Sequence, residues 1–174
     1  MNQMNEQFSA ESAQVGHTDS EQYLTFFMGN EEFGVNILSV QEIRGWDPVT
    51  PIPNAPKHVV GVMNLRGTVV PIVDLRRCFA MTKVQYTEQT VVIILSVRAG
   101  PQKKIIGVVV DAVSDVYNFD LASIQPSPEL SQSEQAQYVK GLGSTDSRMV
   151  ILLELTGNLL ADTAAPVSSF RRAG

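Results

Sequence analysis

Residues 33–43, FGVNILSVQEI, align without a gap on residues 106–116, IGVVVDAVSDV, when the chain is shifted by 73 positions (106 − 33). The shift places Gly34 on Gly107, and it places Val35, Val40 and Ile43 on valines of the second segment. A match of this length within one chain indicates an internal repeat. The fold is therefore expected to contain two copies of one unit.

A second shift extends the repeat. Moving the chain by 80 positions (141 − 61) places Gly61 on Gly141 and lays residues 61–75 over residues 141–155. The copies are expected near 22–79 and 90–160, each a five-stranded unit. A barrel of about 60 residues buries little surface alone, so the two barrels are expected to pack on each other and to leave a groove between them. Exchange of strands between the copies is left open.

The remaining pattern is that of an all-β chain. Short runs rich in valine and isoleucine alternate with turn signals, as in strands. These runs lie at 23–28, 31–37, 58–64, 67–75, 90–97, 103–113 and 148–155. Helical signals are weak and predict only short turns, within 74–81, 127–140 and 155–161.

Composition excludes several classes of function. The chain of 174 residues has 13 Lys and Arg against 18 Asp and Glu, a net charge of −5, without the basic stripe that nucleic-acid binding needs. The N-terminus lacks the pattern of a signal peptide, and no apolar run approaches the length of a membrane span, so a cytoplasmic protein is expected. One cysteine, Cys78, and two histidines provide no disulfide and no zinc cluster. Residues 1–21 and 161–174 are predicted to be mobile tails.

The turn NLRG, residues 64–67, carries an arginine that the repeat does not require. The shift of 80 sets Arg66 against Asp146, a reversal of charge at the same hairpin tip. Gly67 suits the left-handed position of a three-residue hairpin loop, which would fix the direction of Arg66. Arg66 is either a solvated loop residue or, with an exposed Leu65, an anchor for a partner.

Other positions have both a structural and a functional interpretation. Val40 and Ile43 are expected in the core more than in a contact, because both have apolar counterparts in the second copy. Trp46 is expected to pack under the proline-rich loop that follows it, rather than to stack on a ligand. Asp74 and Glu154 recur before a leucine, which favours capping over function. The glycines expected to be structural are Gly34, Gly61, Gly67, Gly107 and Gly141.

Catalytic motifs are missing from the sequence. It has no nucleophile elbow, no phosphate-binding glycine loop and no zinc-protease motif. Four carboxylates remain possible partners in space, namely Glu42, Asp74, Asp111 and Asp115. The expectation is a protein without enzymatic activity, cofactor or metal.

Four segments together carry a family resemblance. VQEIRG (40–45), GVMNLRG (61–67), VPIVDLR (70–76) and VSDV (113–116), in this order and spacing, resemble the CheW family of bacterial chemotaxis coupling proteins over about residues 20–160. The resemblance implies two tandem five-stranded SH3-like β-barrels. It further implies an adaptor, monomeric when free, that joins the cytoplasmic tips of methyl-accepting chemoreceptors to the regulatory domain of the histidine kinase CheA in membrane-associated arrays, without inserting into the membrane.

The resemblance also suggests site residues. Those expected in or near the receptor surface are Ile37, Val40, Glu42, Asn64, Leu65 and Arg66. Those suggested for the kinase surface are Ile43, Arg44, Tyr117 and Phe119. Arg66 is expected to pair with polar groups of the receptor, and the alternative is an intramolecular pair with Glu42. Rival interpretations are the coupling domain of a receiver-domain fusion or of the kinase itself, an adaptor of a chemosensory pathway unrelated to motility, and a β-barrel nucleic-acid binder.

Overall fold

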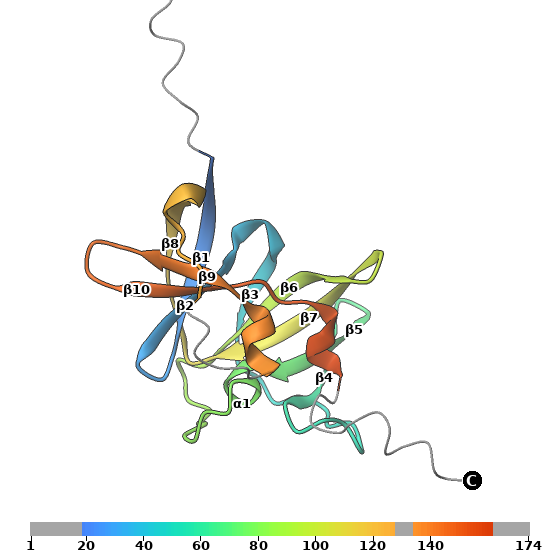
Figure 1. Ribbon diagram of the computed structural model, residues 1–174. Coiled ribbons are helices and arrows are strands. Elements are labelled where there is room, and N and C mark those ends of the chain that lie inside the picture. The colour runs from blue at the N-terminus through green and yellow to red at the C-terminus, as the bar shows by residue number, and fades with distance from the viewer. Residues whose placement is uncertain (1–18, 128–133, 162–174) are drawn as a thin grey trace, which may run out of the picture.

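The computed structural model describes residues 19–127 and 134–161, which form ten strands and a few short helical turns (Figure 1). The strands are β1 (Ser20–Met28), β2 (Glu31–Asn36), β3 (Val40–Gly45), β4 (Val59–Leu65), β5 (Thr68–Asp74), β6 (Val91–Ala99), β7 (Gln102–Val110), β8 (Ala112–Asp120), β9 (Val139–Ser144) and β10 (Met149–Leu153). The helical turns are α1 (Leu75–Cys78), η2 (Ile37–Ser39), η3 (Leu121–Ser123), η4 (Glu134–Tyr138) and η5 (Gly157–Leu160).

The ten strands form two five-stranded sheets with the same internal order. One sheet, here the terminal sheet, has the order β8-β1-β2-β10-β9, and the other, the central sheet, has the order β3-β6-β7-β5-β4. The two copies of the repeat are β1–β5 and β6–β10. When the strands are numbered within each copy, both sheets have the order third, first, second, fifth and fourth strand. The parallel pairs β2/β10 and β5/β7 occupy equivalent places. The all-β double-sheet architecture and the repeat are thus confirmed.

Each sheet contains strands from both copies of the repeat, whereas the sequence predicted one barrel from residues 22–79 and the other from residues 90–160. Each sheet takes its first and second strands from one copy and its last three from the other. Only η2 (Ile37–Ser39) joins β2 to β3, and only Asp111 joins β7 to β8. In each sheet the third strand lies beside the first, on the side away from the second. If it came from the same copy as these two strands, the connection from the second strand would have to span two strand spacings, about 10 Å. The short connections instead lead directly into the other sheet.

Each sheet closes toward a barrel through the segment that follows its third strand. Thr50 pairs with Val62 of β4 by two backbone hydrogen bonds of 3.0 and 2.8 Å, and Gln125 pairs with Leu142 of β9 by bonds of 2.9 and 2.7 Å. The close approach leaves no room for a side chain beside either bridge. A Cβ on Gly61 would overlap the carbonyl of Thr50, and one on Gly141 would lie 2.7 Å from the carbonyl oxygen of Gln125.

The main hydrophobic core lies between the two sheets. It contains buried residues from both, among them Phe26, Ile93, Leu95, Val108 and Leu153. Smaller cores fill the inside of each barrel, one around Ile72 and the other around Tyr23 and Leu152. Because each fully buried apolar side chain contributes about 1.5–3 kcal/mol, the shared core holds two small barrels together that would be marginal alone.

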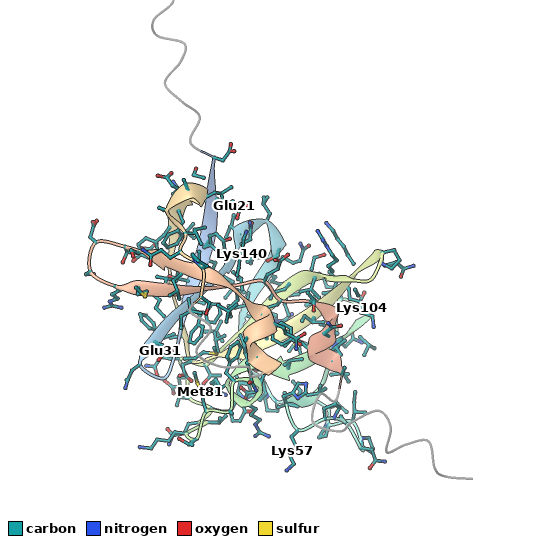
Figure 2. The ribbon with its side chains drawn as sticks, in the orientation of Figure 1. Glu21, Glu31, Lys57, Met81, Lys104 and Lys140 are labelled. Carbon is teal, nitrogen blue, oxygen red and sulfur yellow. The ribbon has the colours of Figure 1, made fainter. Side chains whose placement is uncertain are left out.

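An ion pair links two strands of the terminal sheet that are not neighbours. Glu21 on β1 accepts hydrogen bonds from Lys140 of β9 at 3.0 Å and from the Tyr23 hydroxyl at 2.8 Å (Figure 2). The hydrogen bond from Lys140 lowers the pKa of Glu21. Glu21 is therefore part of the barrel and not of the predicted tail at 1–21. The rest of that tail up to residue 18, and residues 162–174 of the second tail, lie outside the described residues.

Candidate partner-binding site

The turn that carries Arg66 is tighter than expected. Leu65 pairs directly with Thr68, so the hairpin loop contains only two residues and not three. Arg66 and Gly67 have φ of +49° and +88°, and positive φ at both loop residues matches the twist of the flanking strands. The Asn64 side chain accepts a hydrogen bond of 2.7 Å from the Gly67 amide. The turn therefore holds Arg66 on a rigid base, and Asn64 helps to shape it.

Arg66 forms the intramolecular pair that was the alternative expectation. Its Nη2 lies 2.8 Å from Oε2 of Glu42 on β3, and the Arg66 side chain is nevertheless 74% exposed. Arg44 approaches the other oxygen of Glu42 at 3.7 Å. Glu42 thus joins two arginines on the outside of the central sheet. An exposed pair contributes about 0–1 kcal/mol, so the arrangement orients these groups more than it stabilises the fold.

The apolar residues of the predicted receptor surface are distributed differently from the expectation. Leu65 is buried, because it faces the interior of the central barrel. Ile37 and Val40 are partly buried against the main core. The exposed apolar residues nearby are Leu38 of η2, 87% exposed, and Val69 of β5, 64% exposed. The sequence did not predict that these two residues are exposed. A signal existed for Leu38, because it lies in the short turn η2, which has no buried residues.

A groove lies between the two sheets next to η2. Its volume is about 190 Å³, and its walls come from three separate parts of the chain, within 35–39, 95–103 and 153–155. Asn36 and Ser39 line one side, and residues of β6 and the start of β7 line the other, including Leu95, Arg98 and Lys103. The expected groove between packed barrels is therefore present, with apolar walls and charged margins.

The residues suggested for the kinase do not form one exposed surface. Ile43 on β3 is 45% exposed, and its counterpart in the repeat, Val116 on β8, is 41% exposed. Phe119 is 3% exposed and packs edge-on against Tyr23, with ring centroids 5.8 Å apart. Alternate residues of β8 face the inside of the terminal barrel, which removes Phe119 as a direct contact. Tyr117 lies on the same face and is partly buried.

A buried ion cluster joins the two sheets. Arg76 of α1, 1% exposed, makes two hydrogen bonds of 2.9 Å to Asp74 and one of 2.8 Å to Asp111. Asp111 also accepts a hydrogen bond of 2.7 Å from the amide of Gly29 in the β1–β2 turn. Burial opposes the charge of Arg76, but the two carboxylates outweigh it and raise the pKa of Arg76 above its ordinary value. The cluster thus connects the end of the central sheet to a turn of the terminal sheet.

The same cluster positions the aromatic side chains beneath the proline-rich loop. Tyr86 donates a hydrogen bond of 2.6 Å to Asp74 and stacks on Trp46, with ring centroids 4.5 Å apart. Asp74 also caps α1 by accepting a bond from the amide of Arg76. The structural interpretations of Trp46 and Asp74 both agree with this geometry.

Two of the four carboxylates considered for catalysis come together, with an arginine between them. Asp74 and Asp111 share Arg76 between them, whereas Glu42 pairs with Arg66 and Arg44. Burial raises the pKa of the Cys78 thiol to about 11, which disfavours the reactive thiolate. Within residues 19–127 and 134–161, no three histidine, cysteine or carboxylate side chains cluster as metal ligands. The same part of the chain contains no helix long and apolar enough to cross a membrane.

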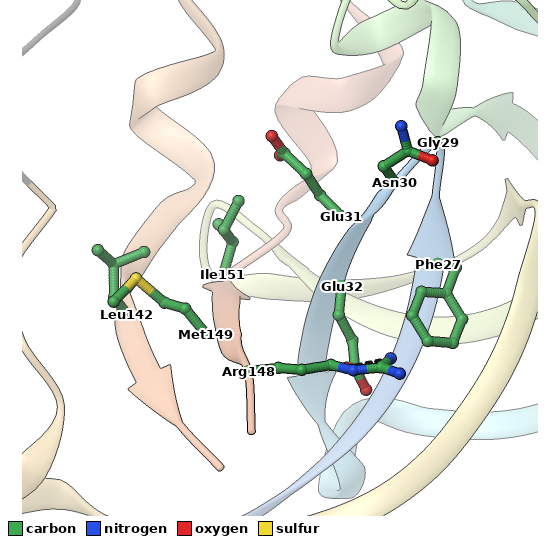
Figure 3. Close-up of a pocket in the computed structure, with 9 residues that line it drawn as sticks. All are labelled: Phe27, Gly29, Asn30, Glu31, Glu32, Leu142, Arg148, Met149 and Ile151. Carbon is green, nitrogen blue, oxygen red and sulfur yellow. Dashed lines mark ion pairs between the residues drawn. The ribbon is translucent and has the colours of Figure 1, made fainter. Parts of the chain in front are cut away.

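A larger groove of about 800 Å³ opens at one end of the terminal barrel (Figure 3). Its apolar lining includes Phe27 and Met149, and Arg148 reaches toward Glu32 of β2, with 3.6 Å between Nη1 and Oε2. Glu32 is buried, and its other oxygen has no hydrogen-bond partner among the described residues. A buried polar atom without a partner is costly.

The sequence was compared with protein families and with individual proteins, and the matches agree with the double-barrel fold described above. Residues 22–162 match the family model described as CheW-like domain. The chain is 44% identical over 155 residues to chemotaxis protein CheW of Klebsiella aerogenes, covering 89% of this chain and 91% of that protein. It is 32% identical over 155 residues to chemotaxis protein CheW of Helicobacter pylori, covering 88% and 90%.

A solved structure supports the same assignment. The crystal structure of the scaffolding protein TtCheW from Thermoanaerobacter tengcongensis superposes with a TM-score of 0.74 at 30% identity, covering 84% of this chain and 97% of that one. The chain described here belongs to the CheW-like domain family.

Proposed function

We propose that this chain is a non-enzymatic chemotaxis adaptor, which couples methyl-accepting chemoreceptors to the histidine kinase CheA in cytoplasmic arrays at the membrane. Membership in the CheW-like family supports the role of a scaffold. The observation that carries the proposal is the exposed Arg66, held by a rigid turn and by Glu42 at 2.8 Å. Glu42 lies on β3, which directly follows Ser39 in the wall of the groove. A fold rarely places a residue other than glycine or asparagine at positive φ without a reason.

The receptor contact is proposed at this groove. A helical ridge of a receptor tip can insert apolar side chains between barrels and meet charges at the margin. Leu38 and Val69 add exposed apolar surface near the Glu42–Arg66 pair. Such a contact would bury about 800 Å² or less per partner, which is compatible with micromolar affinity, and avidity in an array would strengthen it.

The first test is a charge swap at the pair. Arg66→Glu is expected to weaken binding on the order of tenfold, because it places two carboxylates side by side and removes the exposed guanidinium. Glu42→Arg combined with Arg66→Glu restores an intramolecular pair of opposite polarity. The measurement is co-sedimentation with phosphatidylcholine vesicles that carry a chemoreceptor cytoplasmic domain, and far-UV circular dichroism checks the fold.

The swap separates the two interpretations of Arg66. If the double variant binds as weakly as Arg66→Glu, Arg66 contacts the receptor directly. If the double variant recovers wild-type binding, the pair serves only to shape the groove, and the direct contact is excluded. Failure of the wild-type chain to bind receptor at all would contradict the proposed function.

We assign the kinase contact to the groove at the end of the terminal barrel, in place of Phe119. It offers exposed Met149 as an apolar anchor and the half-exposed guanidinium of Arg148 beside it. Met149→Glu is expected to reduce recruitment of CheA to receptor vesicles about tenfold, because apolar anchors dominate such contacts. Binding of the variant to receptor vesicles alone should be unchanged. Normal recruitment of CheA by Met149→Glu would contradict the assignment.

A further inference from the structure

The hairpin between β6 and β7 concentrates positive charge in an acidic protein. Arg98 lies directly opposite Lys103 across the two strands, and Lys104 follows on β7. All three side chains are exposed, and none forms an ion pair with any described residue. Like charges directly opposite each other destabilise a sheet, so this arrangement works against the stability of the isolated chain. A partner of opposite charge would remove that cost.

The position of the hairpin connects it to the proposed receptor surface. Because β5 and β7 are parallel, with Ile72 opposite Gly107, both strands begin at the same end of the central sheet. The Arg66–Gly67 turn precedes β5, so it lies at that end with the β6–β7 turn. Arg98 and Lys103 also line the groove beside η2, together with Leu95 and Ser39. The cations therefore extend the margin that Arg66 begins.

The surroundings of the cations indicate a protein partner rather than a lipid surface. Glu154 lines the groove, Glu42 pairs with Arg66, and the chain as a whole has a net charge of −5, so an anionic membrane would be repelled from most of this face. Glu154 lines the groove without forming an ion pair to Arg98 or Lys103. A helix with an apolar ridge and carboxylates along one flank matches both the groove and its basic margin.

We infer that Arg98 and Lys103 form a second contact for the receptor, which binds aspartate or glutamate side chains on the flank of the helix seated in the groove. This inference rests on the proposed function. It adds that the receptor helix bound in the groove carries acidic side chains on one flank. Exposed charges at the margin of an interface mainly raise the association rate and its dependence on salt. Binding is therefore expected to weaken with salt, and part of that dependence is expected to come from the hairpin.

The test is a reversal of charge on the hairpin with a matched control. Arg98→Glu combined with Lys103→Glu is compared with Lys57→Glu combined with Lys83→Glu, which changes the net charge equally. Lys57 and Lys83 are exposed, and they lie near the opposite end of the central sheet: Lys57 precedes β4, and Lys83 lines a cavity with Asp111, which follows β7. Figure 2 shows Lys57 and Lys104 on well separated parts of the molecule.

Binding of each full chain to phosphatidylcholine vesicles carrying a chemoreceptor cytoplasmic domain is measured at low and high salt. The hairpin variant is expected to bind on the order of tenfold more weakly at low salt, with a smaller salt dependence, while the control variant binds like wild type. Equal binding of wild type and hairpin variant would overturn the inference and leave the adaptor function intact. Equal weakening of both variants would show a general effect of net charge and would also overturn it.

Two further outcomes separate the remaining possibilities. Vesicles that contain anionic lipid but no receptor should not bind the wild-type chain, and binding that the hairpin reversal abolishes would identify a lipid contact and overturn the inference. If the wild-type chain does not bind receptor vesicles at either salt concentration, the proposed function fails and the assignment of the hairpin fails with it.

Discussion

Replacing Arg76 by methionine is expected to lower the free energy of unfolding by about 3–5 kcal/mol, the usual cost of leaving one member of a buried ion pair without its partner. Methionine keeps most of the side-chain volume but removes the guanidinium hydrogen bonds to Asp74 and Asp111, while the backbone amide of residue 76 still donates to Asp74. Asp74 is fully buried, so its charge would lose its main compensation. Urea unfolding at constant pH measures the effect, which is a large part of a typical stability of 5–15 kcal/mol.

Two further variants identify the cause. Arg77→Met removes a neighbouring, half-exposed arginine that lies 3.9 Å from Asp74, and it should cost less than about 1 kcal/mol. Asp74→Asn combined with Arg76→Met removes the orphaned charge and is expected to recover part of the loss. If Arg76→Met is no more costly than Arg77→Met, the buried cluster does not hold the sheets together. The double variant also provides a measurable protein if Arg76→Met alone does not fold.

Replacing Gly61 by alanine is expected to cost about 3 kcal/mol or more, although it adds a single methyl group. Gly61 has a φ of +155°, and a Cβ there would overlap the backbone carbonyl of Thr50. Relief of the overlap requires movement of the Thr50–Val62 bridge, which loses two backbone hydrogen bonds at the closure of the central barrel. Thermal and urea unfolding should both show the loss.

The other glycines supply graded controls for this prediction. Gly45→Ala should change stability by less than about 0.5 kcal/mol, because no atom lies within 4 Å of the added Cβ. Gly141→Ala should fall between the two, since its close neighbours include the flexible methyl of Ile124 at 2.6 Å as well as backbone. A cost for Gly61→Ala equal to that for Gly45→Ala would mean that the barrel closes without the tight approach seen here.

Comparison of the two copies of the repeat predicted a role for Arg66 but not for Arg76. Positions that differ between the copies were expected to be free for function, which led to Arg66. The same rule fails for Arg76, which the shift of 80 sets against Thr156. Thr156 caps η5, whereas Arg76 is buried in the ion cluster that joins the sheets. An arginine in a short helical turn normally faces solvent, so no local pattern indicated that this one is buried.

Burial within a hairpin was also beyond the reach of local patterns. Leu65 stands next to a turn and Phe119 near the end of a strand, places where side chains are often exposed, yet both face barrel interiors. Whether a side chain at the end of a strand is buried depends on how the sheet closes into a barrel. The closure is made by Thr50 and Gln125, which lie outside the strands and bridge to β4 and β9. Exposed Leu38 shows the converse, an apolar residue that no distant segment of the described chain covers.

By itself, the sequence determined the all-β class, the two copies of a five-stranded unit, the repeated glycines Gly61 and Gly141 and the arginine at a hairpin tip. Each of these depends on periodicity, turn chemistry or similarity between two segments of the chain. Only the tertiary structure decided that the copies exchange their last three strands, that Arg66 pairs with Glu42, and that Arg76 joins the sheets. Strand partners and ion pairs form between residues far apart in the chain, and their choice depends on how short connections and a shared core orient the two sheets.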